Sequence, residues 1–163
     1  MIIAVGGAVL FILALALSTL LDPAVGVLHG AQSLLYIVIA VLIWRRQAWG
    51  YGAGVTVAAL WNGANLFATG FIAGGLESLW VLLRTGHLSR PALLLVLIGA
   101  FGHFLMIAGC LVGFLGTRSE ARSWGKFFLG AVLVFLVLAA ISPLRHHPIA
   151  LPLDIPVSRD VVH

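Results

Sequence analysis

Long apolar runs, broken only by short clusters of Arg, Gly and Pro, constrain this chain more than any other feature. Hydrophobic residues make up 62% of the sequence and charged residues only 9%. Runs of this length cannot all be buried inside a water-soluble domain of 163 residues, so most of the surface must face lipid. The sequence therefore predicts an integral membrane protein.

Several of the runs approach the roughly 20 apolar residues with which a helix crosses a bilayer. Helices are expected because backbone polar groups in lipid must be hydrogen-bonded within their own segment. We predict an all-α domain of five transmembrane helices over residues 1–141, with spans at 2–21, 24–44, 49–72, 91–115 and 124–141. A four-helix alternative removes the third span, because it contains Asn62 and Asn65.

Two segments are not expected to span. In residues 74–90, apolar side chains recur with the period of one helix face, which predicts a short helix in the membrane interface, with a plain loop as the alternative. Residues 142–163 carry a proline every four or five positions, which favours an extended tail. We expect this tail either to clasp a neighbouring subunit or to form a disordered terminus.

The basic residues lie at the ends of the spans, so the net charge of +4 does not indicate nucleic-acid binding. The charge bias between short loops predicts a cytoplasmic N-terminus and an outer C-terminus, in a membrane such as the bacterial inner membrane. In this orientation the inner side holds Arg45, Arg46, Arg118, Arg122 and Lys126, and the outer side holds Arg84, Arg90, Arg145 and Arg159.

Two parts of the chain resemble each other. His29 precedes Arg45 by 16 positions and His103 precedes Arg118 by 15, and a Trp-Gly pair follows in both cases. At about 1.5 Å per helical residue, both histidines are predicted at nearly the same depth in the outer half of the bilayer. Ionisable side chains within a membrane span are functional-site candidates.

Two imidazoles at one depth could hold the iron of haem b from both sides, with Arg84 and Arg90 as candidate partners of the haem propionates. A chlorophyll-type pigment would need only one of them. The alternative is that His29 and His103 only pack and hydrogen-bond within the bundle. We assign the same packing role to Gln32, Asn62 and Asn65. We predict no metal site, because His146, His147 and His163 lack zinc-site spacing.

We predict a small non-catalytic membrane subunit that packs in a larger, energy-transducing complex for electron transfer or photosynthesis. The alternatives are a haem- or pigment-binding electron carrier and a small uncoupled transporter or channel. In size and helix count the expected bundle resembles the small five-helix porphyrin-binding membrane proteins and the haem-bearing anchor subunits of respiratory dehydrogenases, without a shared motif.

Overall fold

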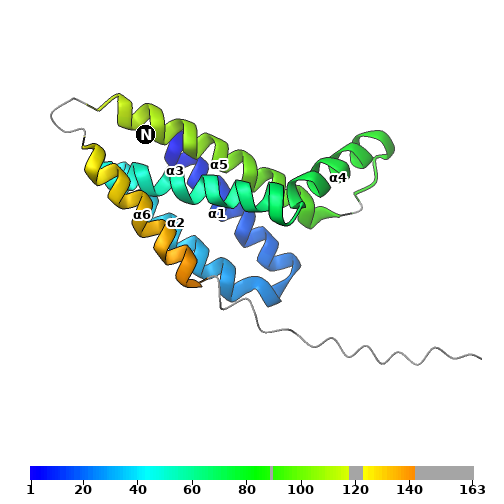
Figure 1. The fold of residues 1–163 in the computed structure, drawn as a ribbon. Helices are drawn as coiled ribbons and strands as arrows, with labels where there is room; N and C mark the ends of the chain where they lie inside the picture. The colour runs from blue at the N-terminus through cyan, green and yellow to red at the C-terminus, as the bar shows by residue number, and fades with distance from the viewer. Residues whose placement is uncertain (89, 118–122, 142–163) are drawn as a thin grey trace, which may run out of the picture.

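The computed structural model describes residues 1–88, 90–117 and 123–141. The predicted tail at 142–163 lies outside these residues, as do Arg118, Arg122 and the histidines at 146, 147 and 163. The described elements are α1 (Ile2–Leu21), the 3₁₀ turn η1 (Pro23–Val25), α2 (Gly26–Trp44), α3 (Ala48–Gly63), the π-helical turn η2 (Ala64–Ala68), α4 (Phe71–Thr85), α5 (Pro91–Leu115) and α6 (Trp124–Ile141) (Figure 1).

The helices begin and end at residues that cap or interrupt a helix. The Asp22 carboxylate accepts a hydrogen bond from the Ala24 amide at 3.1 Å, and Pro23 then begins η1. Pro91 similarly occupies the first turn of α5. The chain leaves α2 through Arg46, whose φ is +56°. These signals place α1, α2, α5 and α6 close to four of the predicted spans.

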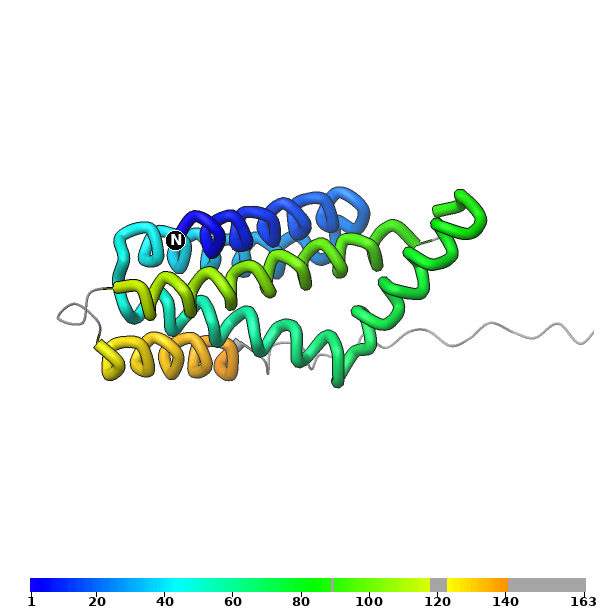
Figure 2. Tube along the Cα trace, turned by 90° about the horizontal axis from the view of Figure 1, so that it is seen from above, coloured from blue at the N-terminus to red at the C-terminus, as the bar shows by residue number. Residues whose placement is uncertain are grey.

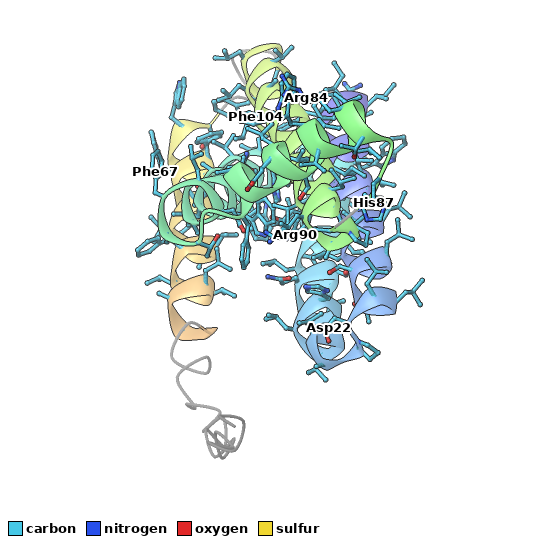
Figure 3. All side chains as sticks on the ribbon, turned by 90° about the vertical axis from the view of Figure 1, so that its right-hand side faces the viewer. Asp22, Phe67, Arg84, His87, Arg90 and Phe104 are labelled. Atoms are coloured by element: carbon cyan, nitrogen blue, oxygen red, sulfur yellow. The ribbon has the colours of Figure 1, made fainter. Side chains whose placement is uncertain are left out.

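Within the described residues, three helices are long and apolar enough to cross a membrane. They correspond to Ile2–Leu21, Pro23–Trp44 and Pro91–Leu115. A fourth candidate arises if α3 and α4 are counted together as one bent span. These helices indicate a membrane protein. Many apolar side chains project from the outside of the bundle, among them Phe67 and Phe104 (Figure 3).

The predicted span at 49–72 is not one straight helix. Its α-helical part ends at Gly63, a π-helical turn follows, and the chain bends by 74° into α4. Gly70 sits in the bend with φ at +66°, a left-handed conformation that glycine adopts without steric cost. The interfacial segment predicted at 74–90 is helical as far as Thr85, and its helix begins earlier than predicted, at Phe71.

The exposed face of α4 is apolar. Leu76, Trp80 and Leu83 are all more than half exposed, whereas Gly75 and Ser78 are buried. A Cβ on Gly75 would lie 2.7 Å from the Leu93 carbonyl oxygen, so this side of α4 packs on α5. An apolar exposed face is what a helix at a membrane interface requires.

The long helices alternate in direction and form one bundle (Figures 1 and 2). Glycines bring their backbones together at the end that holds the N-terminus. A Cβ on Gly102 would lie 2.8 Å from the Gly7 carbonyl oxygen, which joins α5 to α1. A Cβ on Gly130 would lie 2.6 Å from the Trp49 carbonyl carbon, which joins α6 to α3. Such small-residue contacts are the usual way in which membrane helices pack closely.

Candidate functional site

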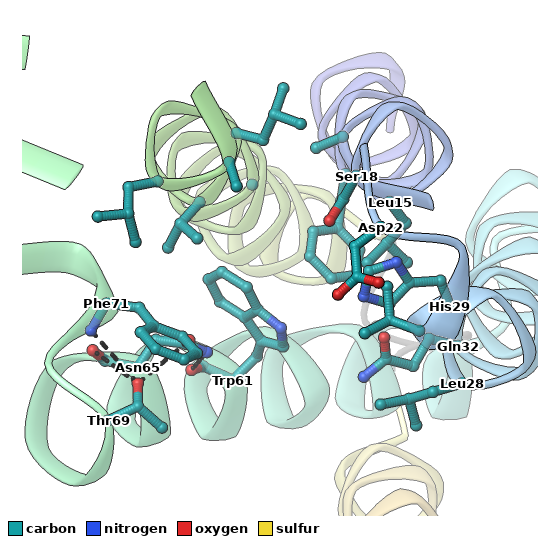
Figure 4. Close-up of a pocket in the computed structure, with 18 of the residues that line it drawn as sticks. Leu15, Ser18, Asp22, Leu28, His29, Gln32, Trp61, Asn65, Thr69 and Phe71 are labelled. Atoms are coloured by element: carbon teal, nitrogen blue, oxygen red, sulfur yellow. Dashed lines mark hydrogen bonds between the residues drawn. The ribbon is translucent and has the colours of Figure 1, made fainter. Parts of the chain in front are cut away.

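A cavity of about 470 Å³ lies between α1, α2, the α3–η2 segment and the beginning of α5. It is at the end of the bundle opposite the glycine contacts, where α1 turns into α2 (Figure 4). Its walls are mainly apolar, but polar side chains enter it from several elements. These are Ser18, Asp22, His29, Gln32, Asn65 and Thr69.

The hydrogen bonds around His29 determine which ring nitrogen carries its proton. The Thr19 hydroxyl donates to the Leu15 carbonyl at 3.0 Å, and its oxygen lies 3.2 Å from His29 Nδ1. With the hydroxyl proton on Leu15, the neutral tautomer that completes these bonds has Nδ1 donating to Thr19 and Nε2 as a hydrogen-bond acceptor.

The opposite wall is built by the irregular turn at η2. The Thr69 amide donates to the Ala64 carbonyl at 3.0 Å, the i to i−5 bond of a π-turn. Asn65 Nδ2 donates to the Trp61 carbonyl at 2.8 Å, and the Phe71 amide donates to the Thr69 hydroxyl at 3.3 Å. Side chains thus take over backbone partners where the helix breaks beside the cavity.

Gln32 and Ser18 are the free polar groups of the cavity. Among the described residues, neither the Gln32 amide nor the Ser18 hydroxyl has a side-chain hydrogen-bond partner, and both residues line the cavity. Asp22 is the one lining residue that carries a formal charge when His29 is neutral. The site therefore combines free donors, free acceptors and one carboxylate.

His103 lies in a different environment. It is fully buried, and its Nε2 lies 2.6 Å from the Tyr36 hydroxyl. The rings of Phe11 and Trp61 pack against it, with centroids at 4.1 and 4.6 Å. Its Nδ1 is buried without a hydrogen-bond partner among the described residues. The aromatic rings around His103 border the cavity, since two of them, Phe11 and Trp61, also line it.

The two histidines are not level. His103 contacts Phe11 and Tyr36, whereas His29 contacts Thr19. Phe11 and Thr19 are eight residues apart on α1, and His29 and Tyr36 are seven apart on α2. At about 1.5 Å per residue, both helices give an offset of roughly 10–12 Å along the bundle. The geometry gives no support to one iron bound by both rings.

The other predicted site residues are dispersed. Arg84 lies over the Trp80 ring at 4.2 Å on the exposed side of α4, and Arg90 is exposed before α5. Neither lines the cavity. Asn62 is buried, with no hydrogen-bond partner among the described residues for either side-chain polar atom, whereas Asn65 and Gln32 belong to the cavity.

Sequence reasoning missed Asp22, Ser18 and Thr69 as cavity residues. Asp22 was available as a signal, since it is an acidic residue between two apolar runs. The described residues 1–88, 90–117 and 123–141 contain no group of three or more His, Cys, Asp or Glu side chains that could hold a metal ion. Comparison of the chain with family models, with curated proteins and with solved structures gives no match.

Proposed function

We propose that this chain is a multi-pass membrane protein that binds a small neutral or cationic molecule in the cavity beside His29, without a catalytic step of its own. The convergence of six polar side chains in one cavity of an otherwise apolar bundle carries this proposal. Polar side chains are costly within a membrane, and those that face a cavity usually mark a binding site.

The charge of the cavity selects the ligand. The Asp22 carboxylate repels an anion and attracts an ammonium group, and no cationic side chain among the described residues lines the cavity to reverse this preference when His29 is neutral. A neutral hydroxyl compound could still use the Gln32 amide, the Ser18 hydroxyl and His29 Nε2. We therefore expect amines and alcohols to bind, and carboxylates to be excluded.

Protection of a cysteine in the cavity tests this function. Cys110 is buried, and its replacement by Ala leaves Ser18→Cys as the reporter in phosphatidylcholine vesicles. A small membrane-permeant maleimide is the labelling reagent. n-Butylamine and n-butanol are expected to slow labelling several-fold, whereas n-butyrate leaves the rate unchanged. The Asp22 carboxylate should make protection by the amine stronger than protection by the alcohol, and Asp22→Asn should make the two equal.

A cysteine outside the cavity provides the control. Thr85→Cys on the exposed end of α4 should be labelled at one rate with or without each compound. Equal protection by butylamine and butyrate, or no protection by any of the three compounds, would contradict the proposed function.

A second function, that of a non-catalytic subunit in a larger membrane assembly, is favoured by α6. This helix packs mainly on α3. It leaves apolar side chains exposed on its other sides, among them Phe128, Val132 and Leu136. A partner helix could cover this face. Mild-detergent isolation from the native membrane should then yield a complex larger than the chain, and a stable monomer would contradict this function.

The energy-transducing form of the subunit hypothesis has less support. Electron transfer through haem b would need a second iron ligand level with His29, and His103 is instead held by Tyr36 beneath the cavity. A visible spectrum of the purified protein tests it directly, because bound haem or pigment absorbs strongly there. We expect a colourless protein.

A further inference from the structure

A second cavity, of about 600 Å³, lies on the other side of α3, between α2 and α6. Its walls are mainly apolar, and the lining residues with polar side-chain atoms are Gln32, Tyr36 and Trp61. The Tyr36 hydroxyl is already paired with His103. The main apolar walls are Leu34, Leu35, Val38, Val57, Leu60, Phe135 and Leu138. We call this space the α2–α6 groove.

The α2–α6 groove adjoins the polar cavity. Leu28, Gln32, Trp61 and Ala64 line both spaces. Figure 4 shows Leu28 and Gln32 next to His29 and Asp22, and in this view Trp61 lies between this group and Asn65. The unpaired Gln32 amide therefore stands where a polar space meets an apolar one.

We infer that the two spaces together bind one single-chain amphiphile. Its polar head, an amine or a hydroxyl, would lie beside Asp22, His29 and Gln32, and its hydrocarbon chain would follow the α2–α6 groove. This inference rests on the proposed function and adds the class of ligand. Both volumes fall in the range of about 300–1,000 Å³ that is usual for ligand sites.

The chemistry of the walls favours an amphiphile over a wholly polar ligand. A polar molecule would leave the α2–α6 groove empty, whereas an alkane would leave the free Gln32 amide and Ser18 hydroxyl facing hydrocarbon without a partner. Leu34 on α2 and Phe135 on α6 are 64% and 53% exposed at the edge of the groove. A ligand dissolved in the membrane could therefore enter sideways, without crossing water.

We prefer a hydrocarbon chain to a partner helix as the occupant, because the groove continues into the polar cavity at Gln32, which gives an amphiphile a place for its head as well as for its chain.

Blocking the groove tests the position of the chain. In the Ser18→Cys protein with Cys110→Ala, n-butylamine and n-dodecylamine are compared at equal concentration in phosphatidylcholine vesicles. Leu60→Trp places a large ring in the groove, since Leu60 lines the groove but not the polar cavity. We expect protection by dodecylamine to weaken about 10-fold, or about 1.4 kcal/mol, while protection by butylamine is unchanged.

Two further variants keep the test decisive. Leu133→Trp adds the same ring on α6 outside both spaces and should change neither compound. Ala139→Trp blocks the groove from α6 and should reproduce Leu60→Trp even if α3 is disturbed in the latter. If all three variants changed protection by dodecylamine equally, the inference that the groove binds the hydrocarbon chain would be overturned. The proposed function would still stand. If butylamine gave no protection in the Ser18→Cys protein without any Trp variant, the proposed function itself would be rejected.

Discussion

The two ends of the bundle are packed in opposite ways. At the end near the N-terminus, Gly7 meets Gly102 and Gly130 meets the Trp49 backbone, so neighbouring helices touch through their main chains. At the other end, Asp22, His29 and Asn65 surround a cavity, and α3 breaks and bends into α4. The comparison teaches that small residues close one end, while polar residues and an irregular turn hold the other end open.

An aromatic layer separates the two ends. Phe11, Tyr36, Trp61 and His103 come from four different helices and contact one another, with ring centroids 4.1–5.4 Å apart. Phe11 and His103 are fully buried. Because bulky rings fill the level at which the glycine contacts stop, the cavity above them does not extend through the bundle.

The largest expected effect is a loss of stability when the close contact between α3 and α6, at the end near the N-terminus, is disrupted. Gly52→Val together with Gly130→Val puts side chains where the α3 and α6 backbones touch, since a Cβ on Gly52 would lie 2.7 Å from the Phe127 carbonyl carbon. Overpacking costs about 1–3 kcal/mol per site, so we expect the pair to lose roughly 3 kcal/mol or more. Thermal unfolding in detergent measures the loss.

Gly125→Val is the matched control on α6, because a Cβ there would meet nothing within 4 Å. Its unfolding temperature should stay near that of the unmodified protein. Similar losses in the control and in the Gly52 and Gly130 pair would mean that the close contact between α3 and α6 does not hold this end together.

The positions of the helices could be predicted, since hydropathy and a few breaks determine them. The limits predicted at 2–21, 91–115 and 124–141 agree with α1, α5 and α6. Helix Ala48–Ala68 covers most of the predicted span at 49–72, but the 74° bend after it was not predicted, because the hydrogen bonds of Asn65 and Thr69 and the positive φ of Gly70 do not register in hydropathy. The number of spans stays a prediction beyond the three to four candidates.

The site could be predicted only in part. His29, Gln32 and Asn65 were singled out as polar residues within spans, and they line one cavity. The predicted common depth of His29 and His103 assumed that α2 and α5 end level. A Cβ on Gly54 would contact both Ile43 and Cys110, so these two residues are level instead. α2 ends at Trp44, one residue after Ile43, whereas α5 continues for five residues after Cys110, to Leu115, so the two helices do not end level.

A smaller effect is expected from changing the bend at the open end. Gly70→Ala forces a side chain into the left-handed conformation at φ +66°, which costs about 1–2 kcal/mol. Gly63→Ala is the control, because Gly63 is helical with open space around it, and this change should stabilise the helix by up to about 1 kcal/mol. Chemical denaturation of both variants checks the difference in sign, and an unchanged stability of Gly70→Ala would show that the bend does not depend on this glycine.

The smallest effect separates the two histidines. In a double-mutant cycle, Tyr36→Phe with His103→Leu should show a coupling of about 0.6 kcal/mol, with an upper limit near 1.7 kcal/mol for a hydrogen bond within a membrane protein. Thr19→Val with His29→Leu should show a weaker coupling. The reason is that His29 is only partly buried and lines a cavity, whereas His103 is fully buried. Equal couplings in the two cycles would show that both histidines serve packing alike, and they would remove the distinction between a structural imidazole in the aromatic layer and a binding imidazole in the cavity.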